Sequence, residues 1–181
     1  MSKSQKLRRK SKVQPWSSPK RESVKFVGLF VGLSVGFYLF YCWLRSHLVF
    51  LSEATATIAG FCLSPWGINI VIDGALLSAN NFSLRVIDEC TAVYSSMVYA
   101  SAILAYPASW KSKGIGLLGI PILYVLNLIR LVVLILVGIH YPDIFEFVHV
   151  YLWQGTFIIF IILIFLLWIN IIVKKQGAKA S

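Results

Sequence analysis

Charged residues, acidic ones above all, are scarce in this sequence. Only 13% of its 181 residues are Asp, Glu, Lys or Arg, about half the ~25% of an ordinary soluble chain, and just seven are acidic. So few charges could not cover the surface of a soluble domain, which excludes a cytosolic enzyme and a disordered chain. The composition, with only three cysteines, also excludes a disulfide-stapled secreted module. Apolar residues instead make up 58% of the chain, and the mean hydropathy of +0.78 indicates a membrane protein.

Positive charge is concentrated at the amino terminus. Nine of the 17 basic residues lie within residues 1–25, where Glu22 is the only acid. Such a tail could bind nucleic acid, but a hydrophobic run follows it immediately, and no aromatic interleaving accompanies it. We therefore predict a cytoplasmic tail that contacts anionic membrane lipid and has no nucleic-acid partner.

Four apolar stretches are long enough to cross a bilayer. At 1.5 Å per residue they cover roughly 24–38 Å, against a hydrocarbon core of about 30 Å. The third is longer than this core and should tilt, or kink near Pro121 or Asn127. The predicted membrane domain comprises residues 26–173, with spans at 26–44, 90–106, 114–139 and 153–173, followed by a short tail at 174–181.

Lysine and arginine in the flanks predict the orientation. The amino-terminal tail, the loop containing Lys111 and Lys113, and the tail that begins with Lys174 are all basic and would lie in the cytoplasm. An even number of spans permits this arrangement, with residues 45–89 and 140–152 outside. The string at 54–56 resembles a signal-peptide cleavage site, but the apolar run before it exceeds a signal h-region, so we expect the first span to be retained.

The outer segment 45–89 is the only sizeable part that does not cross the membrane. Residues 51–63 are weakly amphipathic and could lie along the membrane surface. Residues 68–74 and 82–87 have strand character, and Asn80-Asn81 is a turn signal between them. We predict an all-α polytopic membrane protein with about four transmembrane helices and a small β-hairpin or three-stranded flap on the outer face.

Arg130 is the one charge within the predicted spans. It lies 16 residues after Gly114, or about 24 Å of helical rise, which places it in the outer third of the bilayer. An arginine there could simply reach the headgroups from a structural helix. Asn127, three residues earlier on the same helix face, favours instead a polar stripe that points into the helix bundle.

Cys90 differs from the other cysteines in its position. It opens the second span at the outer boundary, directly after two acidic residues, whereas Cys42 lies inside the first span and is expected to be structural. Cys62 is also on the outer side, so a disulfide between Cys62 and Cys90 is an alternative if the compartment is oxidising. Because neighbouring carboxylates disfavour a thiolate, a nucleophilic Cys90 would need Arg130 or a histidine close by.

His149 lies about one turn before the fourth span, at the same level as Cys90 and Arg130. His140 ends the third span, where a capping or headgroup role is the safer interpretation. Three consecutive elements thus bring a thiol, a guanidinium and an imidazole to one membrane depth. A thiol with an imidazole acid/base is the arrangement of cysteine acyl transfer, and a cation can stabilise its oxyanion. The spacing alone does not require that chemistry. The histidines and cysteines of the sequence lack the spacing of metal ligands, and the sequence has no nucleotide-binding loop, so we expect no metal and no cofactor.

At these residues the sequence resembles the exosortase/archaeosortase family, and its small size resembles the short exosortase H type. The resemblance covers roughly residues 26–173 and is carried by the order and spacing of three motifs: Glu89-Cys90-Thr91, Asn127-Leu128-Ile129-Arg130 and His149-Val150-Tyr151-Leu152-Trp153-Gln154-Gly155. The β-like stretch before the cysteine and the basic loop at 111–113 also match the family's layout.

The resemblance implies a multi-pass cysteine transpeptidase of a bacterial cytoplasmic membrane, with its active site on the outer face. Its substrates would be exported proteins that end in a recognition motif, a transmembrane helix and a basic cluster. By position, Cys90 would form a thioester with the substrate, Arg130 would stabilise the oxyanion or thiolate, and His149 would act as acid and base. The acceptor could be an anchor molecule or water.

One position departs from the family's pattern, and the choice of the acid/base histidine stays open. The family often has glycine two residues after the cysteine, where this chain has Ala92. His140 is the alternative to His149 as acid/base, and Asn127 could orient Arg130 by hydrogen bonding. The competing functions are a simple hydrolytic protease and a non-catalytic membrane scaffold in which Arg130 pairs with a carboxylate of this chain or of a partner. A transporter is disfavoured because the chain has no pair of discontinuous helices.

Overall fold

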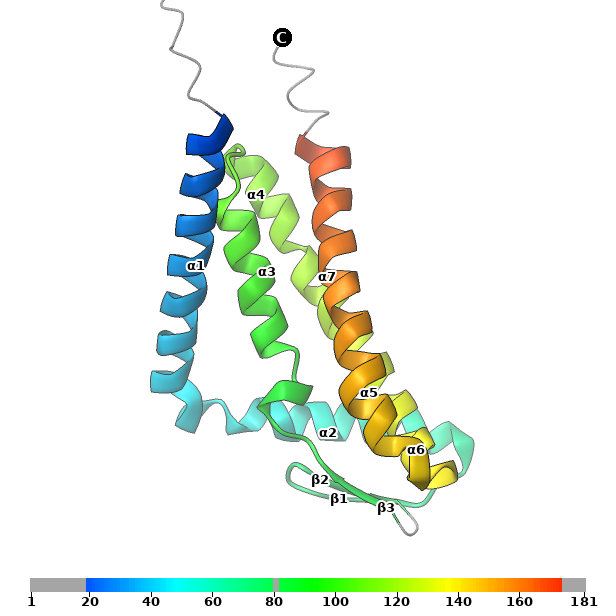
Figure 1. The fold of residues 1–181 in the computed structure, drawn as a ribbon. Coiled ribbons are helices and arrows are strands. Elements are labelled where there is room, and N and C mark those ends of the chain that lie inside the picture. Colours follow the sequence, from blue (N-terminus) through cyan, green and yellow to red (C-terminus); the bar gives the residue numbers. More distant parts are fainter. Residues whose placement is uncertain (1–18, 80–81, 174–181) are drawn as a thin grey trace, which may run out of the picture.

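Four helical legs run between two ends of the molecule in the computed structural model, which describes residues 19–79 and 82–173 (Figure 1). The legs are α1 (Pro19–Leu44), α3 (Val93–Ala105), α4 (Trp110–Leu117) with α5 (Gly119–His140), and α7 (Trp153–Trp168). The chain alternates in direction from leg to leg, so the beginning of α1 and the end of α7 lie at the same end (Figure 1). The predicted class, a polytopic helical membrane protein with a small sheet, is confirmed. The predicted tails lie outside the described residues, apart from 19–25, which are already helical and belong to α1.

Three of the legs are long and apolar enough to cross a bilayer. They correspond to Arg21–His47, Trp110–His140 and Pro142–Val173. The last includes three further helical pieces, α6 (Pro142–Phe147), η5 (Val148–Leu152) and η6 (Ile169–Val173), that continue α7 at both ends. Its helix therefore begins eleven residues before the predicted start at Trp153, and the segment predicted to be an outer loop is largely helical.

The second predicted span differs most from its prediction. Its helix begins at Val93, not at Cys90, and its 13 residues rise only about 20 Å, short of the ~30 Å hydrocarbon core. The reason lies in the preceding turn. Cys90 ends the 3₁₀ turn η4 (Asp88–Cys90), and Ala92 has φ of 60° and ψ of 8°, in the left-handed region, so a right-handed helix cannot pass through it. Cys90 consequently lies in a turn that precedes the short apolar helix α3.

The third leg is interrupted at Leu118, between α4 and α5. Pro121 explains the position, because a proline lacks an N–H and its ring opposes the carbonyl four residues earlier, here that of Leu117. The irregularity that the sequence predicted near Pro121 thus falls one turn before it. At this end of the molecule, Tyr99 donates to the Gly116 carbonyl (2.9 Å) and Trp168 to the Ser112 carbonyl (2.8 Å), which ties three legs together.

The outer segment forms a crosswise helix and a sheet at the end opposite the described termini (Figure 1). The segment comprises η2 (Arg45–His47), α2 (Val49–Leu63), η3 (Ser64–Trp66), β1 (Ile70–Asp73), β2 (Leu76–Ala79) and β3 (Phe82–Arg85). The strands are antiparallel in the order β1-β2-β3. The predicted three-stranded flap is confirmed, while the turn predicted at Asn80-Asn81 lies outside the described residues.

This layer of α2 and the sheet is fixed to α5 by close packing. Gly138 of α5 lies against the ring of Phe82, so closely that a Cβ atom at residue 138 would overlap the ring. Phe82 also makes an edge-to-face contact with Phe145 of α6, at 5.0 Å between ring centroids. One buried cluster joins α2, the sheet, the cysteine turn and α5; it contains Ala56, Ala59, Leu63, Leu77, Val86, Cys90, Leu131 and Ile135.

Candidate active site

The turn that carries Cys90 is fixed by backbone hydrogen bonds on both sides of the cysteine. Val86 N–H donates to the Ala75 carbonyl (2.8 Å) and ends the sheet, and Cys90 N–H donates to the Ile87 carbonyl (2.8 Å). Thr91 donates to the Asp88 carbonyl through its N–H (3.2 Å) and its hydroxyl (2.7 Å). The nucleophile candidate therefore lies on a defined turn between the sheet and α3.

Asn127 supports this turn from α5. Its side-chain amide donates to the carbonyl of Cys90, and the residue is only 1% exposed. The sequence analysis expected Asn127 to orient Arg130; the recorded hydrogen bond instead holds the backbone of the cysteine. Asn127 and Arg130 are three residues apart on one helix face. The same face of α5 therefore carries both the amide that holds the Cys90 backbone and the cation.

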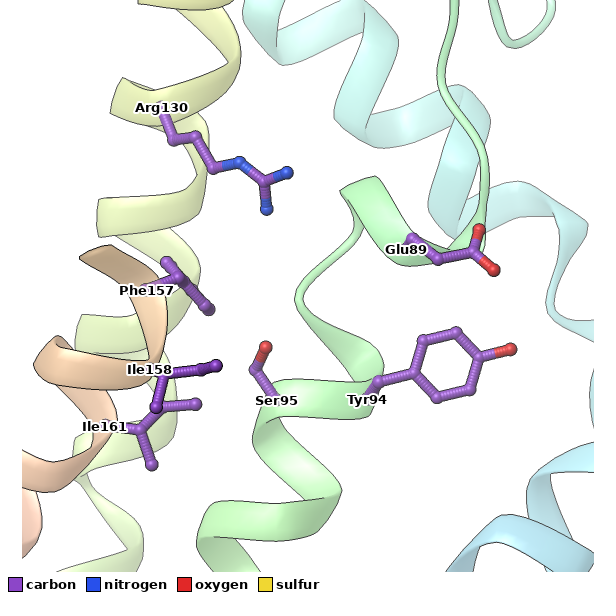
Figure 2. Close-up of a pocket in the computed structure, with 7 residues that line it drawn as sticks. All are labelled: Glu89, Tyr94, Ser95, Arg130, Phe157, Ile158 and Ile161. Carbon is purple, nitrogen blue, oxygen red and sulfur yellow. The ribbon is translucent and has the colours of Figure 1, made fainter. Parts of the chain in front are cut away.

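Arg130 points from α5 into a pocket of about 230 Å³ between α3, α5 and α7 (Figure 2). The residue is 8% exposed, its guanidinium lies 5.8 Å from the centroid of the Phe157 ring, and its Nε is buried without a hydrogen-bond partner. Ser95 points its hydroxyl toward the guanidinium, whereas Glu89 points away from it (Figure 2). Among the described residues, Arg130 makes no ion pair. This pocket thus presents an uncompensated cation above an apolar floor.

Asp88 is held elsewhere and is not a partner of Arg130. Its carboxylate lies 2.7 Å from Nε of Arg45, the first residue of η2, which directly follows α1. The scaffold hypothesis in which Arg130 pairs with Asp88 or Glu89 of its own chain is therefore wrong for this structure. The sequence offered no signal for the Arg45–Asp88 pair, because the two residues are 43 positions apart and neither lies in a recognisable motif.

His149 is near Arg130, and His140 is not. His149 lies on the π-helical turn η5, is partly buried, stacks on Phe145 at 5.7 Å and has a buried Nδ1 without a partner. Arg130 is within electrostatic range of both Cys90 and His149. His140 is exposed, its Nδ1–H donates to the Leu136 carbonyl (2.9 Å), and it lies about 15 Å of helical rise beyond Arg130. The geometry favours His149 over His140 as the acid/base.

The thiol of Cys90 is buried in the resting structure. Cys90 is 5% exposed, packs in the cluster with Leu131 and does not line the Arg130 pocket, although its neighbour Glu89 does. Burial raises the pKa of the Cys90 thiol above its ordinary value; the hydrogen bond at Ile87 and the Arg130 charge lower this pKa, and Glu89 raises it. Burial thus favours the thiol over the thiolate, and the residue lies outside the lining of the Arg130 pocket.

All three cysteines are free, with Cys42 and Cys62 exposed and Cys90 buried. The disulfide between Cys62 and Cys90 that the sequence left open is absent from this structure. No cluster of three or more metal-ligating side chains occurs within the described part of the chain.

The arrangement has the parts that cysteine acyl transfer requires. A thiol, a cation without an internal partner and an imidazole with a free ring nitrogen come from three elements that the fold brings together. The pocket adds an apolar floor formed by Phe157, Ile158 and Ile161 of α7 (Figure 2).

The model of the transmembrane exosortase family (Exosortase_EpsH) matches residues 22–169, which is most of the chain. Neither the curated proteins nor the solved structures gave a match.

Proposed function

Because the chain belongs to the transmembrane exosortase family, we propose that it is a membrane-embedded cysteine transpeptidase that cleaves exported proteins near their carboxyl terminus and transfers them to an acceptor. The observation that carries the proposal is the unpaired, buried Arg130 beside Cys90 and His149. An uncompensated cation within a membrane domain is costly, so its position beside a thiol and an imidazole favours a chemical role.

The first half-reaction starts from the thiol. Rotation about the Cys90 side chain carries Sγ from the apolar cluster to the pocket, and His149 takes the thiol proton. The thiolate attacks the carbonyl carbon of the scissile peptide bond, and the carbonyl oxygen becomes an oxyanion that Arg130 stabilises. Collapse breaks the C–N bond, His149 returns a proton to the leaving amine, and an acyl thioester remains on Cys90.

The second half-reaction releases the acyl group. A nucleophilic hydroxyl or amine of the acceptor attacks the thioester while His149 takes its proton, and the thiolate of Cys90 leaves. Water in the same place gives hydrolysis. Asn127 takes no proton in either step; it holds the Cys90 backbone while the charge develops at the sulfur and the oxygen.

The substrate and location follow from the family and the charge pattern. The substrates would be membrane-anchored proteins that carry a carboxyl-terminal motif, a transmembrane helix and a basic tail. The crosswise helix and the sheet would face the outside of a bacterial cytoplasmic membrane, because the basic loop and tails favour the cytoplasm at the other end. The cysteine turn lies beside this outer layer, so cleavage would occur at the outer face.

The proposal is tested in liposomes that contain the protein and a substrate of this architecture. Wild type should shorten the substrate and accumulate a thioester adduct visible by intact mass, while Cys90→Ala should do neither. Cys62→Ala is the matched control, because Cys62 is an exposed cysteine of the same outer segment and should keep activity. The product mass distinguishes transfer from hydrolysis. Equal processing by wild type and Cys90→Ala would overturn the proposal, and unprocessed substrate with both proteins would favour the scaffold hypothesis.

A further inference from the structure

The turn that carries Cys90 is connected to α1 by a group of side chains with no part in the proposed chemistry. Asp88 receives Arg45 Nε at 2.7 Å, and its side chain is 18% exposed although the arginine is 67% exposed. Tyr41 of α1, itself 5% exposed, lies beside the same carboxylate. The Asp88 carbonyl meanwhile accepts both hydrogen bonds from Thr91. Asp88 is thus bonded through its side chain to Arg45, directly after α1, and through its backbone to the residue after the cysteine.

A second contact extends this connection into α3. The rings of Tyr41 and Tyr94 meet edge to face at 5.3 Å, and Tyr38 lies 6.3 Å from Tyr94. Tyr94 is on the first turn of α3, two residues after the left-handed Ala92. A left-handed non-glycine residue persists only where its surroundings determine the conformation. Here, α1 holds both sides of the residue.

The charge of Asp88 makes this connection relevant to the thiol. Asp88 and Glu89 directly precede Cys90, and carboxylates this close would oppose a thiolate. In this structure the charges that act on the thiol are those of Glu89 and Arg130, while Asp88 is paired with Arg45. The α2 carboxylate, that of Glu53, lies instead beside Gly74 at the sheet.

We propose that Arg45 and Asp88, with Tyr41, position the nucleophile: the ion pair holds the cysteine turn against the end of the first leg and neutralises a carboxylate two residues before the cysteine. The first leg is then part of the active site's support and more than a membrane anchor. The importance of this role rests on the proposed function, but its test needs no substrate.

The experiment follows alkylation of Cys90 by iodoacetamide across pH in the full-length protein in detergent, with Cys42 and Cys62 replaced by alanine. Arg45→Gln leaves the Asp88 charge uncompensated, so the rate profile should move to higher pH by about 0.5–1 unit, a roughly three- to ten-fold slower reaction at neutral pH. Adding Asp88→Asn should return the profile to the wild-type position or below it, because the amide keeps the shape without the charge.

A matched control is available at the other end of the same helix. Lys25→Gln removes the exposed ion pair with Glu22 (3.6 Å) and should leave the profile unchanged. A profile that does not move in Arg45→Gln, or that is identical in Arg45→Gln with and without Asp88→Asn, would overturn the proposal, even if both variants melt earlier. Since alkylation reports on the thiol alone, failure to find substrate cleavage would count against the proposed function and not against this inference.

Discussion

The left-handed conformation of Ala92 leads to a testable prediction for the substitution Ala92→Gly. Ala92 occupies the position where the resembling family often has glycine, and its φ of 60° is one that glycine adopts without steric cost. It is also 3% exposed, so its methyl group contributes packing. Replacing it with glycine therefore changes the free energy of unfolding through opposing effects that can be separated.

The expected magnitude follows from three contributions. Relief of the left-handed strain favours glycine by about 1–2 kcal/mol. Loss of the buried methyl costs about 0.8 kcal/mol, and the greater freedom of glycine in the unfolded chain costs about 0.4–1 kcal/mol. These nearly cancel, so Ala92→Gly should have a free energy of unfolding within about 1 kcal/mol of wild type.

A control alanine isolates the strain. Ala56 is fully buried inside the regular helix α2, where glycine relieves no strain. Ala56→Gly should lose about 1.5–2 kcal/mol, from its lower helix propensity and the lost methyl. Unfolding of both variants by SDS titration in mixed micelles measures the difference. Equal losses in the two variants would refute the strain at Ala92.

Two further outcomes follow from the site and its packing. Arg130→Lys should keep the pH profile of Cys90 alkylation near that of wild type, whereas Arg130→Ala should move it to higher pH. The reactive thiolate forms above the thiol pKa, which burial raises and the Arg130 charge lowers, so a variant in which the charge makes no difference would contradict the electrostatic contact. Gly138→Ala should displace Phe82 and lower the melting temperature by several degrees, while Gly114→Ala, with open space around its Cβ, should not. Equal melting temperatures would show that the sheet is not fixed at this contact.

The features that sequence predicted are those encoded in runs of consecutive residues. Continuous apolar stretches predicted the legs, and alternating residues between turn signals predicted the sheet. The common depth of Cys90, Arg130 and His149 followed from counting residues along helices of fixed rise, which is why three residues from distant segments could be proposed together.

Other features depend on contacts between segments and left no local signal. The amide of Asn127 could have reached Arg130 on its own helix, but the turn at Cys90 brings a carbonyl closer to it. The short α3 depends on one residue, Ala92, whose helical propensity favours the opposite conformation. The burial of the Cys90 thiol likewise follows from how α2 and the sheet pack on α5, which residue order does not specify.

The energetics of Arg130 separate a catalytic role from a structural one. A charge within a membrane-spanning helix costs about 2.5–3.5 kcal/mol, and the Phe157 ring offsets roughly 0.5–2 kcal/mol of it. Among the described residues no carboxylate offsets the remainder. Arg130→Met, which keeps an unbranched apolar stem and removes the charge, should therefore be more stable than wild type by about 1–2 kcal/mol and yet be inactive.

The stability and the activity of Arg130→Met are measured separately, the first by SDS unfolding and the second by substrate processing. A stable, inactive Arg130→Met would indicate that stability is lost in wild type to keep a cation where an oxyanion forms. A destabilised variant would instead mean that the guanidinium has a structural partner in the assembled protein, as the scaffold hypothesis requires. Retained processing would remove Arg130 from the mechanism, whatever its effect on stability.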